Sequence, residues 1–183
     1  TADDLGDEPL QIARKFPKAV VAVDANRQRG IEILVKLAAP EVILLDDGFQ
    51  HRKVRPHRSI LLTAYDELYP REAYLPAGNL RDHRSQARRA DLIVVTKCPD
   101  SLSGHDRERI RRLLNPEPGQ QLAFASLCYS EARDLQGKPV PLEVLQAKPL
   151  ALVTGIARPE PLLEYLDGLD ITYKHFKYRD HHR

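Results

Sequence analysis

The sequence predicts an α/β fold with a mainly parallel sheet and helices on both faces, and two observations support this prediction. Short apolar runs recur along the chain, and segments with helical periodicity separate most of them. This alternation is typical of parallel strands joined by helical crossovers. With 183 residues, 42% of them hydrophobic, the chain is long enough to bury one sizeable core.

The predicted strands coincide with the apolar runs, which are bounded by polar or turn-forming residues. They occur at residues Ala19–Val23, Val42–Leu45, Ile60–Thr63, Leu92–Thr96, Gln121–Leu127 and Leu150–Thr154.

Four helices are predicted from apolar spacing and end signals. The first begins at Asp7-Glu8-Pro9, because proline is accepted in a first helical turn. The second covers Gln28–Leu37 and is ended by Pro40. The others cover His105–Leu114, which is ended by an Asn-Pro pair, and Pro159–Leu166.

Breaks in the pattern suggest how the chain is divided. Residues 1–130 form the predicted core α/β domain. Because glycine and prolines interrupt the segment from Ser130 to Lys148, residues 131–183 are predicted either to begin a second, smaller lobe or to continue the sheet. The polar connection Tyr65–Ser85 is long, which favours a functional loop over a tight crossover.

Composition excludes several classes of protein. A formal net charge of +2 argues against a nucleic-acid role, and aromatic residues do not interleave the arginine-rich stretches. Those stretches, Arg84–Arg89 and Arg107–Arg112, are predicted to be solvated helix faces or a patch beside a membrane surface. Cys98 and Cys128 lack metal-site spacing and are predicted to be buried thiols. No apolar run is long enough to cross a bilayer.

The most informative stretch is Asp46-Asp47-Gly48-Phe49-Gln50-His51, directly after the apolar run Val42–Leu45. Ligands gather at the carboxyl ends of strands in α/β folds, and two carboxylates there can hold magnesium beside a phosphate. Gly48 allows the turn that lets both carboxylates reach one ion. The simpler interpretation is an acidic turn after a strand, with His51 as a surface histidine.

Five segments in a fixed order carry a resemblance that spans essentially the whole chain. They are Gly6-Asp7-Glu8-Pro9, Asp46 to Arg52, Leu75-Pro76-Ala77-Gly78 with Leu80-Arg81, Thr154-Gly155-Ile156-Ala157-Arg158-Pro159, and Asp180-His181. Together they resemble the tetraacyldisaccharide 4'-kinase family, the lipid A 4'-kinases of Gram-negative bacteria. This resemblance implies a P-loop-NTPase-like fold, ATP and Mg²⁺ as cofactors, and a lipid-linked disaccharide substrate at the cytoplasmic face of the inner membrane, with peripheral attachment.

The resemblance also implies roles for individual residues. Asp7 would be the general base for the sugar 4'-hydroxyl, with His181 as its partner, although helix capping is the simpler role for Asp7 and Glu8. Gln50, His51, Arg81 and Arg158 would contact the nucleotide phosphates, and the magnesium candidates are Asp46, Asp47 and Glu8. Asp82 stands where the family commonly has a glutamate.

A phosphate-cradling Gly-x-x-x-x-Gly-Lys-Ser/Thr loop does not occur in this sequence, whereas the family carries one upstream. We therefore expect the chain to be an interior piece of a longer kinase, with an incomplete sheet and without activity on its own. Two alternatives are a P-loop-like kinase or NTPase for another substrate, and a non-catalytic nucleotide- or lipid-binding module.

Overall fold

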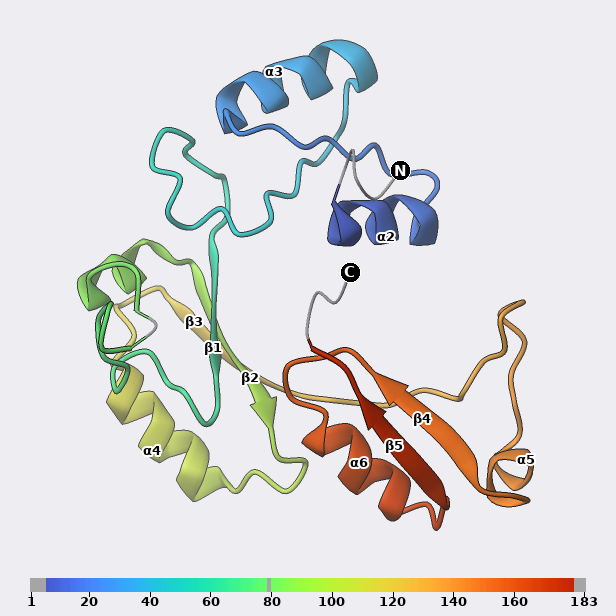
Figure 1. Cartoon of the computed structure of the whole chain (residues 1–183). Helices are drawn as coiled ribbons and strands as arrows, with labels where there is room; N and C mark the ends of the chain where they lie inside the picture. The colour runs from blue at the N-terminus through green and yellow to red at the C-terminus, as the bar shows by residue number, and fades with distance from the viewer. Residues whose placement is uncertain (1–5, 79, 180–183) are drawn as a thin grey trace. The chain divides into compact units, whose positions relative to one another are not determined.

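The computed structural model describes residues 6–78 and 80–179 (Figure 1). The described chain divides into two compact units, one extending to Leu127 and the other starting at Cys128. Each unit contains its own parallel sheet. This confirms the predicted α/β class with parallel strands.

The first unit is organised around a parallel sheet in the order β1-β2-β3. The strands are β1 Ile60–Ala64, β2 Leu92–Cys98 and β3 Gln121–Ser126. The Asp91 amide donates to the Ser59 carbonyl, and the Ser59 amide donates to the Asp91 carboxylate. These two hydrogen bonds align the starts of β1 and β2. The same carboxylate pairs with Arg58, and the bond from the Ser59 amide is the main reason that the pKa of Asp91 is lowered.

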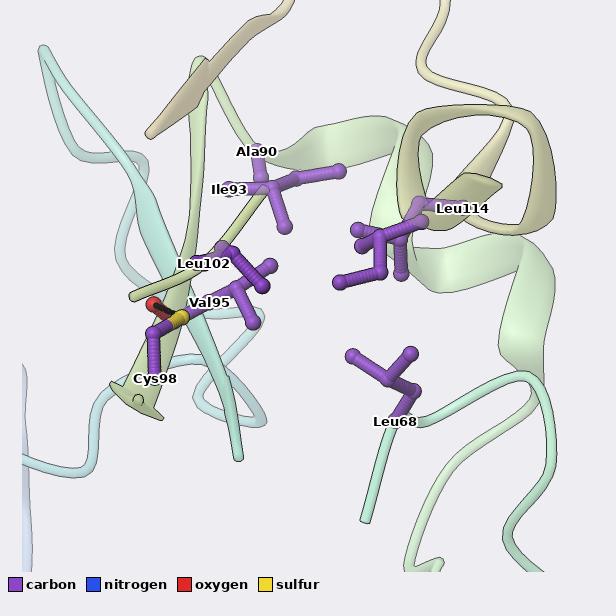
Figure 2. Packing of buried hydrophobic residues seen from close by; sticks show 8 residues of the cluster. Leu68, Ala90, Ile93, Val95, Cys98, Leu102 and Leu114 are labelled. Carbon is purple, nitrogen blue, oxygen red and sulfur yellow. Dashed lines mark hydrogen bonds between the residues drawn. The ribbon is translucent and has the colours of Figure 1, made fainter. Parts of the chain in front are cut away.

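One face of this sheet carries the core of the first unit (Figure 2). Ile93 and Val95 of β2 have no exposed surface, and the β-strand period of two places both on the same face. Helix α4, Gly104–Leu114, contributes Ile110 and Leu114 to this cluster. Its N-cap Ser103 accepts a hydrogen bond from the Asp106 amide, and the helix ends before Asn115 in the left-handed conformation.

The opposite face of the sheet is much more open. Ile60 and Leu62 of β1 are 57% and 63% exposed, although both are large aliphatic side chains. Leu61 and Thr63, which alternate with them, point toward the core face, and Thr63 is buried.

Two further helices lie near the start of the first unit: α2 Asp7–Lys15 and α3 Arg27–Ala38. The side chain of Asn26 caps α3 by accepting from the Arg29 amide. The Asp24 carboxylate binds the Arg29 guanidinium through two 2.8 Å contacts, and this bond lowers the pKa of Asp24. Helix α3 ends at Ala39 in the left-handed conformation, just before Pro40, as predicted.

The two earliest predicted strands are wrong in the described structure. Ala19–Val23 and Val42–Leu45 form no strand ladder with any described segment, and Val42 and Leu44 are 73% and 91% exposed. An apolar run becomes a strand only where a neighbour accepts and donates its backbone hydrogen bonds. Apolar composition alone therefore misidentified these two segments.

The second unit is built on the parallel pair β4 Leu150–Thr154 and β5 Tyr173–Lys177, with α5 Leu142–Gln146 and α6 Glu160–Asp167 (Figure 1). Buried Thr154 shares a 2.8 Å hydrogen bond with the ring of His175 across the pair. The sequence prediction missed β5, because Tyr-Lys-His-Phe-Lys mixes polar and aromatic residues without forming an apolar run.

The cysteines differ from each other. Cys98 is buried in the core, where it donates to the Val95 carbonyl (Figure 2), and burial raises the pKa of its thiol. Cys128 is exposed, so its predicted burial is wrong. The reason is that β3 ends at Ser126, and Cys128 lies in the segment beyond it.

Candidate functional site

The acidic segment Asp46–His51 forms a tight loop in the first unit. Asp47 has a φ of 45°, in the left-handed region that Asp, Asn and Gly tolerate best. A Cβ added to Gly48 would lie 2.6 Å from Cδ2 of Leu45, so the turn requires glycine or a movement of that leucine. The amide of His51 closes the turn by donating to the Gly48 carbonyl at 3.0 Å.

The loop exposes its polar side chains and partly buries Phe49. Asp46, Asp47, Gln50 and His51 are all exposed, whereas Phe49 is partly buried and packs against the core cluster. Within the described part of the chain, no hydrogen bond or ion pair engages the Asp46 carboxylate. The carboxylates of this loop are therefore accessible to a ligand from solution.

Arg81 approaches this loop from the long connection that was predicted to be functional. Its Nη1 lies 3.7 Å from the Asp47 carboxylate, and the two side chains are 67% and 76% exposed. An exposed pair of this kind contributes at most about 1 kcal/mol to stability. The contact therefore places a cation and a carboxylate side by side, and both groups remain exposed to solvent.

The connection itself is tightly packed near Gly78. A Cβ at Gly78 would clash with the Ala73 carbonyl oxygen, so any side chain there would force the backbone apart. Two backbone hydrogen bonds close the loop: the Leu75 amide donates to the Leu80 carbonyl, and the Leu80 amide donates to the Ala73 carbonyl. This fixes the path of the chain just before Arg81.

Asp82 joins the loop and the connection through further contacts. Its carboxylate accepts from the His83 amide at 2.8 Å and lies 3.5 Å from Arg52 and 3.8 Å from Arg89. Arg89 also donates to the Phe49 carbonyl. Sequence reasoning counted Arg89 only as a member of a basic run, and nothing in the sequence distinguishes it from its neighbour Arg88.

Two other predicted site residues, Asp7 and Glu8, make no hydrogen bond or ion pair with this loop within the described part of the chain. Both are exposed in the first turn of α2, where the helix dipole favours carboxylates. Arg158 is an exposed residue of the second unit, between β4 and α6. His181, with Asp180, lies outside the described residues.

The candidate metal ligands of the loop are the exposed carboxylates of Asp46 and Asp47. Residues 6–78 and 80–179 contain no group of three His, Cys, Asp or Glu side chains close enough to hold a metal ion. Magnesium usually keeps several waters and takes only one or two carboxylates together with substrate phosphates. Asp46 and Asp47 are exposed and are neighbours in the sequence, so a pair of carboxylates of this kind is compatible with that pattern.

The arginine runs are largely paired with acidic neighbours. Arg88 contacts Glu117 at 2.8 Å, and Arg111 and Arg112 share Glu108 on α4. These contacts agree with the predicted solvated helix faces. In the part of the chain that the structure describes, no helix has the length and apolar character needed to cross a bilayer.

The parallel sheets define an α/β protein, and its acidic loop exposes carboxylates beside the guanidinium of Arg81. The family model for Tetraacyldisaccharide-1-P 4'-kinase matches residues 1–183, and the chain belongs to this family.

Curated relatives agree with that assignment. The tetraacyldisaccharide 4'-kinase of Flavobacterium johnsoniae is 46% identical over 168 residues, covering 90% of this chain and 49% of the relative. That of Bacteroides thetaiotaomicron is 42% identical over 200 residues, covering 98% and 53%. The chain thus spans about half the length of these relatives.

A solved structure shows the same fold. The crystal structure of LpxK from Aquifex aeolicus, an "apo" form described as in complex with ATP, is 26% identical with a TM-score of 0.73. The match covers all of this chain and 54% of that one. This confirms the predicted P-loop-NTPase-like fold.

Proposed function

We propose that the complete protein transfers the γ-phosphate of ATP to the 4'-hydroxyl of a tetraacyldisaccharide 1-phosphate, in lipid A biosynthesis. The observation that supports this most is membership of the tetraacyldisaccharide 4'-kinase family along residues 1–183. The geometry agrees, because an acidic loop and Arg81 meet at one exposed site. Phosphoryl transfer needs such charges to be positioned around the phosphates.

In this proposal Asp46 and Asp47 hold Mg²⁺, which would neutralise phosphate charge when bound. Arg81 donates hydrogen bonds to phosphate oxygens and turns from Asp47 toward the nucleotide as it does so. Gln50 and His51, both exposed on the same loop, orient the phosphates, and Arg158 contributes a second guanidinium.

Asp7 is proposed to take the proton of the attacking 4'-hydroxyl, with His181 orienting its carboxylate. One observation is compatible with a base at Asp7: it lies exposed in the first turn of α2, where a ligand can reach it. Glu8, next in the chain, is proposed as a further carboxylate on the magnesium side. We also propose that the protein acts at the cytoplasmic face of the inner membrane, because its acceptor carries four acyl chains.

The test is phosphorylation of tetraacyldisaccharide 1-phosphate by the complete protein with radiolabelled ATP and magnesium. Labelled product phosphorylated at the 4'-position is expected, and Asp7→Ala should lower kcat while leaving ATP affinity nearly unchanged. A folded, ATP-binding protein that gives no product would refute the substrate assignment. Loss of ATP binding with normal turnover in Asp7→Ala would remove Asp7 from the base role.

A further inference from the structure

Arg89 makes three contacts that converge on the acidic loop and its neighbour Asp82. Its Nη2 donates to the Phe49 carbonyl at 2.8 Å, and its guanidinium carbon lies 4.5 Å from the centre of the Phe49 ring. The same Nη2 lies 3.8 Å from the Asp82 carboxylate. Its side chain is 37% exposed, against 72% for Arg88 beside it. Arg89 is thus directed toward the loop, and Arg88 is directed toward Glu117.

The backbone that carries Arg89 is firmly held. Arg89 ends the 3-10 helix η1, Arg84–Arg89, between the buried residues Ala87 and Ala90. The side-chain amide of Gln120 donates to the carbonyls of both alanines, at 2.9 and 2.6 Å. Ala90 belongs to the buried cluster that includes Ile93 (Figure 2). Arg89 therefore extends from a rigid part of the first unit.

Phe49 is the residue through which the loop can be fixed. It is the one apolar side chain of Asp46–His51, and it packs against the core cluster while Arg89 covers its ring. A cation over an aromatic face adds attraction to the apolar contact. The exposed side chains on either side of Phe49 gain no comparable packing. The position of the two loop carboxylates thus depends on how firmly Phe49 is held.

We propose that Arg89 is a positioning residue that holds the acidic loop in place through Phe49 and Asp82. The forked guanidinium suits this role, because Nη2 donates to the Phe49 carbonyl while the group as a whole covers the ring, whereas an ammonium group has a single nitrogen for both contacts. Arg52, which lies 3.5 Å from Asp82, adds a second and more exposed link between the loop and the same carboxylate. The consequence for turnover rests on the proposed kinase function, but the effect on the loop does not.

The test compares Arg89→Gln and Arg89→Lys with Arg88→Gln in the complete protein. Arg88→Gln is the matched control, because it removes the same charge from the same helix but from a residue that pairs with Glu117. Amide hydrogen exchange is followed by mass spectrometry in peptides covering the acidic loop and, separately, in peptides from β2. Turnover is measured in parallel as a function of magnesium.

For both Arg89 variants we expect roughly tenfold faster exchange in the acidic loop, with β2 unchanged, and near-normal exchange for Arg88→Gln. The magnesium concentration for half-maximal turnover should rise while the KM for the lipid stays near its normal value. Unchanged loop exchange in Arg89→Gln would overturn the proposal, as would a normal loop in Arg89→Lys or equally faster exchange in β2. Faster loop exchange in a protein that never yields product would support the positioning role and refute the proposed function.

Discussion

Asp47 offers a way to separate the charge of the acidic loop from its backbone shape. Its φ of 45° is one that asparagine also adopts readily, but alanine adopts it at a cost of about 1–2 kcal/mol. Asp47→Asn and Asp47→Ala remove the same negative charge. Only the alanine variant also opposes the left-handed turn.

The structure sets the size of the two effects. The Asp47 carboxylate is 76% exposed and its contact with Arg81 is 3.7 Å long, so losing the pair should cost less than about 1 kcal/mol in either variant. The Asp47→Ala protein should therefore unfold at a lower denaturant concentration, with a free energy of unfolding about 1 kcal/mol below that of Asp47→Asn. If Asp47 holds magnesium, both variants should raise the magnesium requirement, by about tenfold or more.

The assay pairs urea unfolding with a magnesium titration of ATP-dependent lipid phosphorylation by the complete protein. Equal unfolding midpoints for the two variants would refute the argument from the left-handed turn. A normal magnesium requirement in Asp47→Asn would remove Asp47 from the metal site, whatever its stability. The unfolding midpoints test the backbone conformation of Asp47, and the magnesium titration tests its carboxylate. Either conclusion can therefore be refuted without the other.

Three further predictions concern the first unit and the cysteines. Ile110→Ala, at a side chain only 1% exposed, should lower the free energy of unfolding by about 2–5 kcal/mol in urea titrations, and Ile110→Val by about 0.5–1.5 kcal/mol. The pKa of Asp91 is lowered in the folded state, so the stability that its carboxylate contributes is present above the ordinary pKa of 3.8 and is lost as pH falls through the folded-state pKa. Thermal melts of Asp91→Asn should therefore show a smaller loss of melting temperature in acid than melts of the unmodified protein. Iodoacetamide should label Cys128 before Cys98, as read by peptide mass spectrometry, and the reverse order would contradict the burial of Cys98.

The fold class could be predicted from the sequence because its strongest signals are local. Ile93 and Val95 alternate with less buried neighbours, and Pro40 and the Asn115-Pro116 pair mark the ends of α3 and α4. Pairing between strands is not local, which is why two apolar runs were wrongly predicted as strands. Strand β5 was missed because it contains no apolar run. Its pairing with β4, and not its composition, makes it a strand.

For the site, the sequence suggested candidate residues but could not supply their contacts. Asp47 and Arg81 were predicted independently, and the structure brings them together. The difference between Arg88 and Arg89 is invisible in the sequence, because both belong to one basic run. It arises in three dimensions, where η1 turns one guanidinium toward Glu117 and the other onto Phe49.

The acidic loop illustrates how an exposed site can be held without using its charged groups. Its pair with Arg81 is too exposed to fix a backbone, since solvent screens most of the attraction. Burial of Phe49 does not suffer from that screening, and the loop has no other apolar side chain to bury. The apolar contact and Arg89 can thus define the path of the loop while Asp46, Asp47 and His51 remain available to a ligand. A substitution at Phe49 should therefore impair the site more than the loss of any single surface ion pair around it.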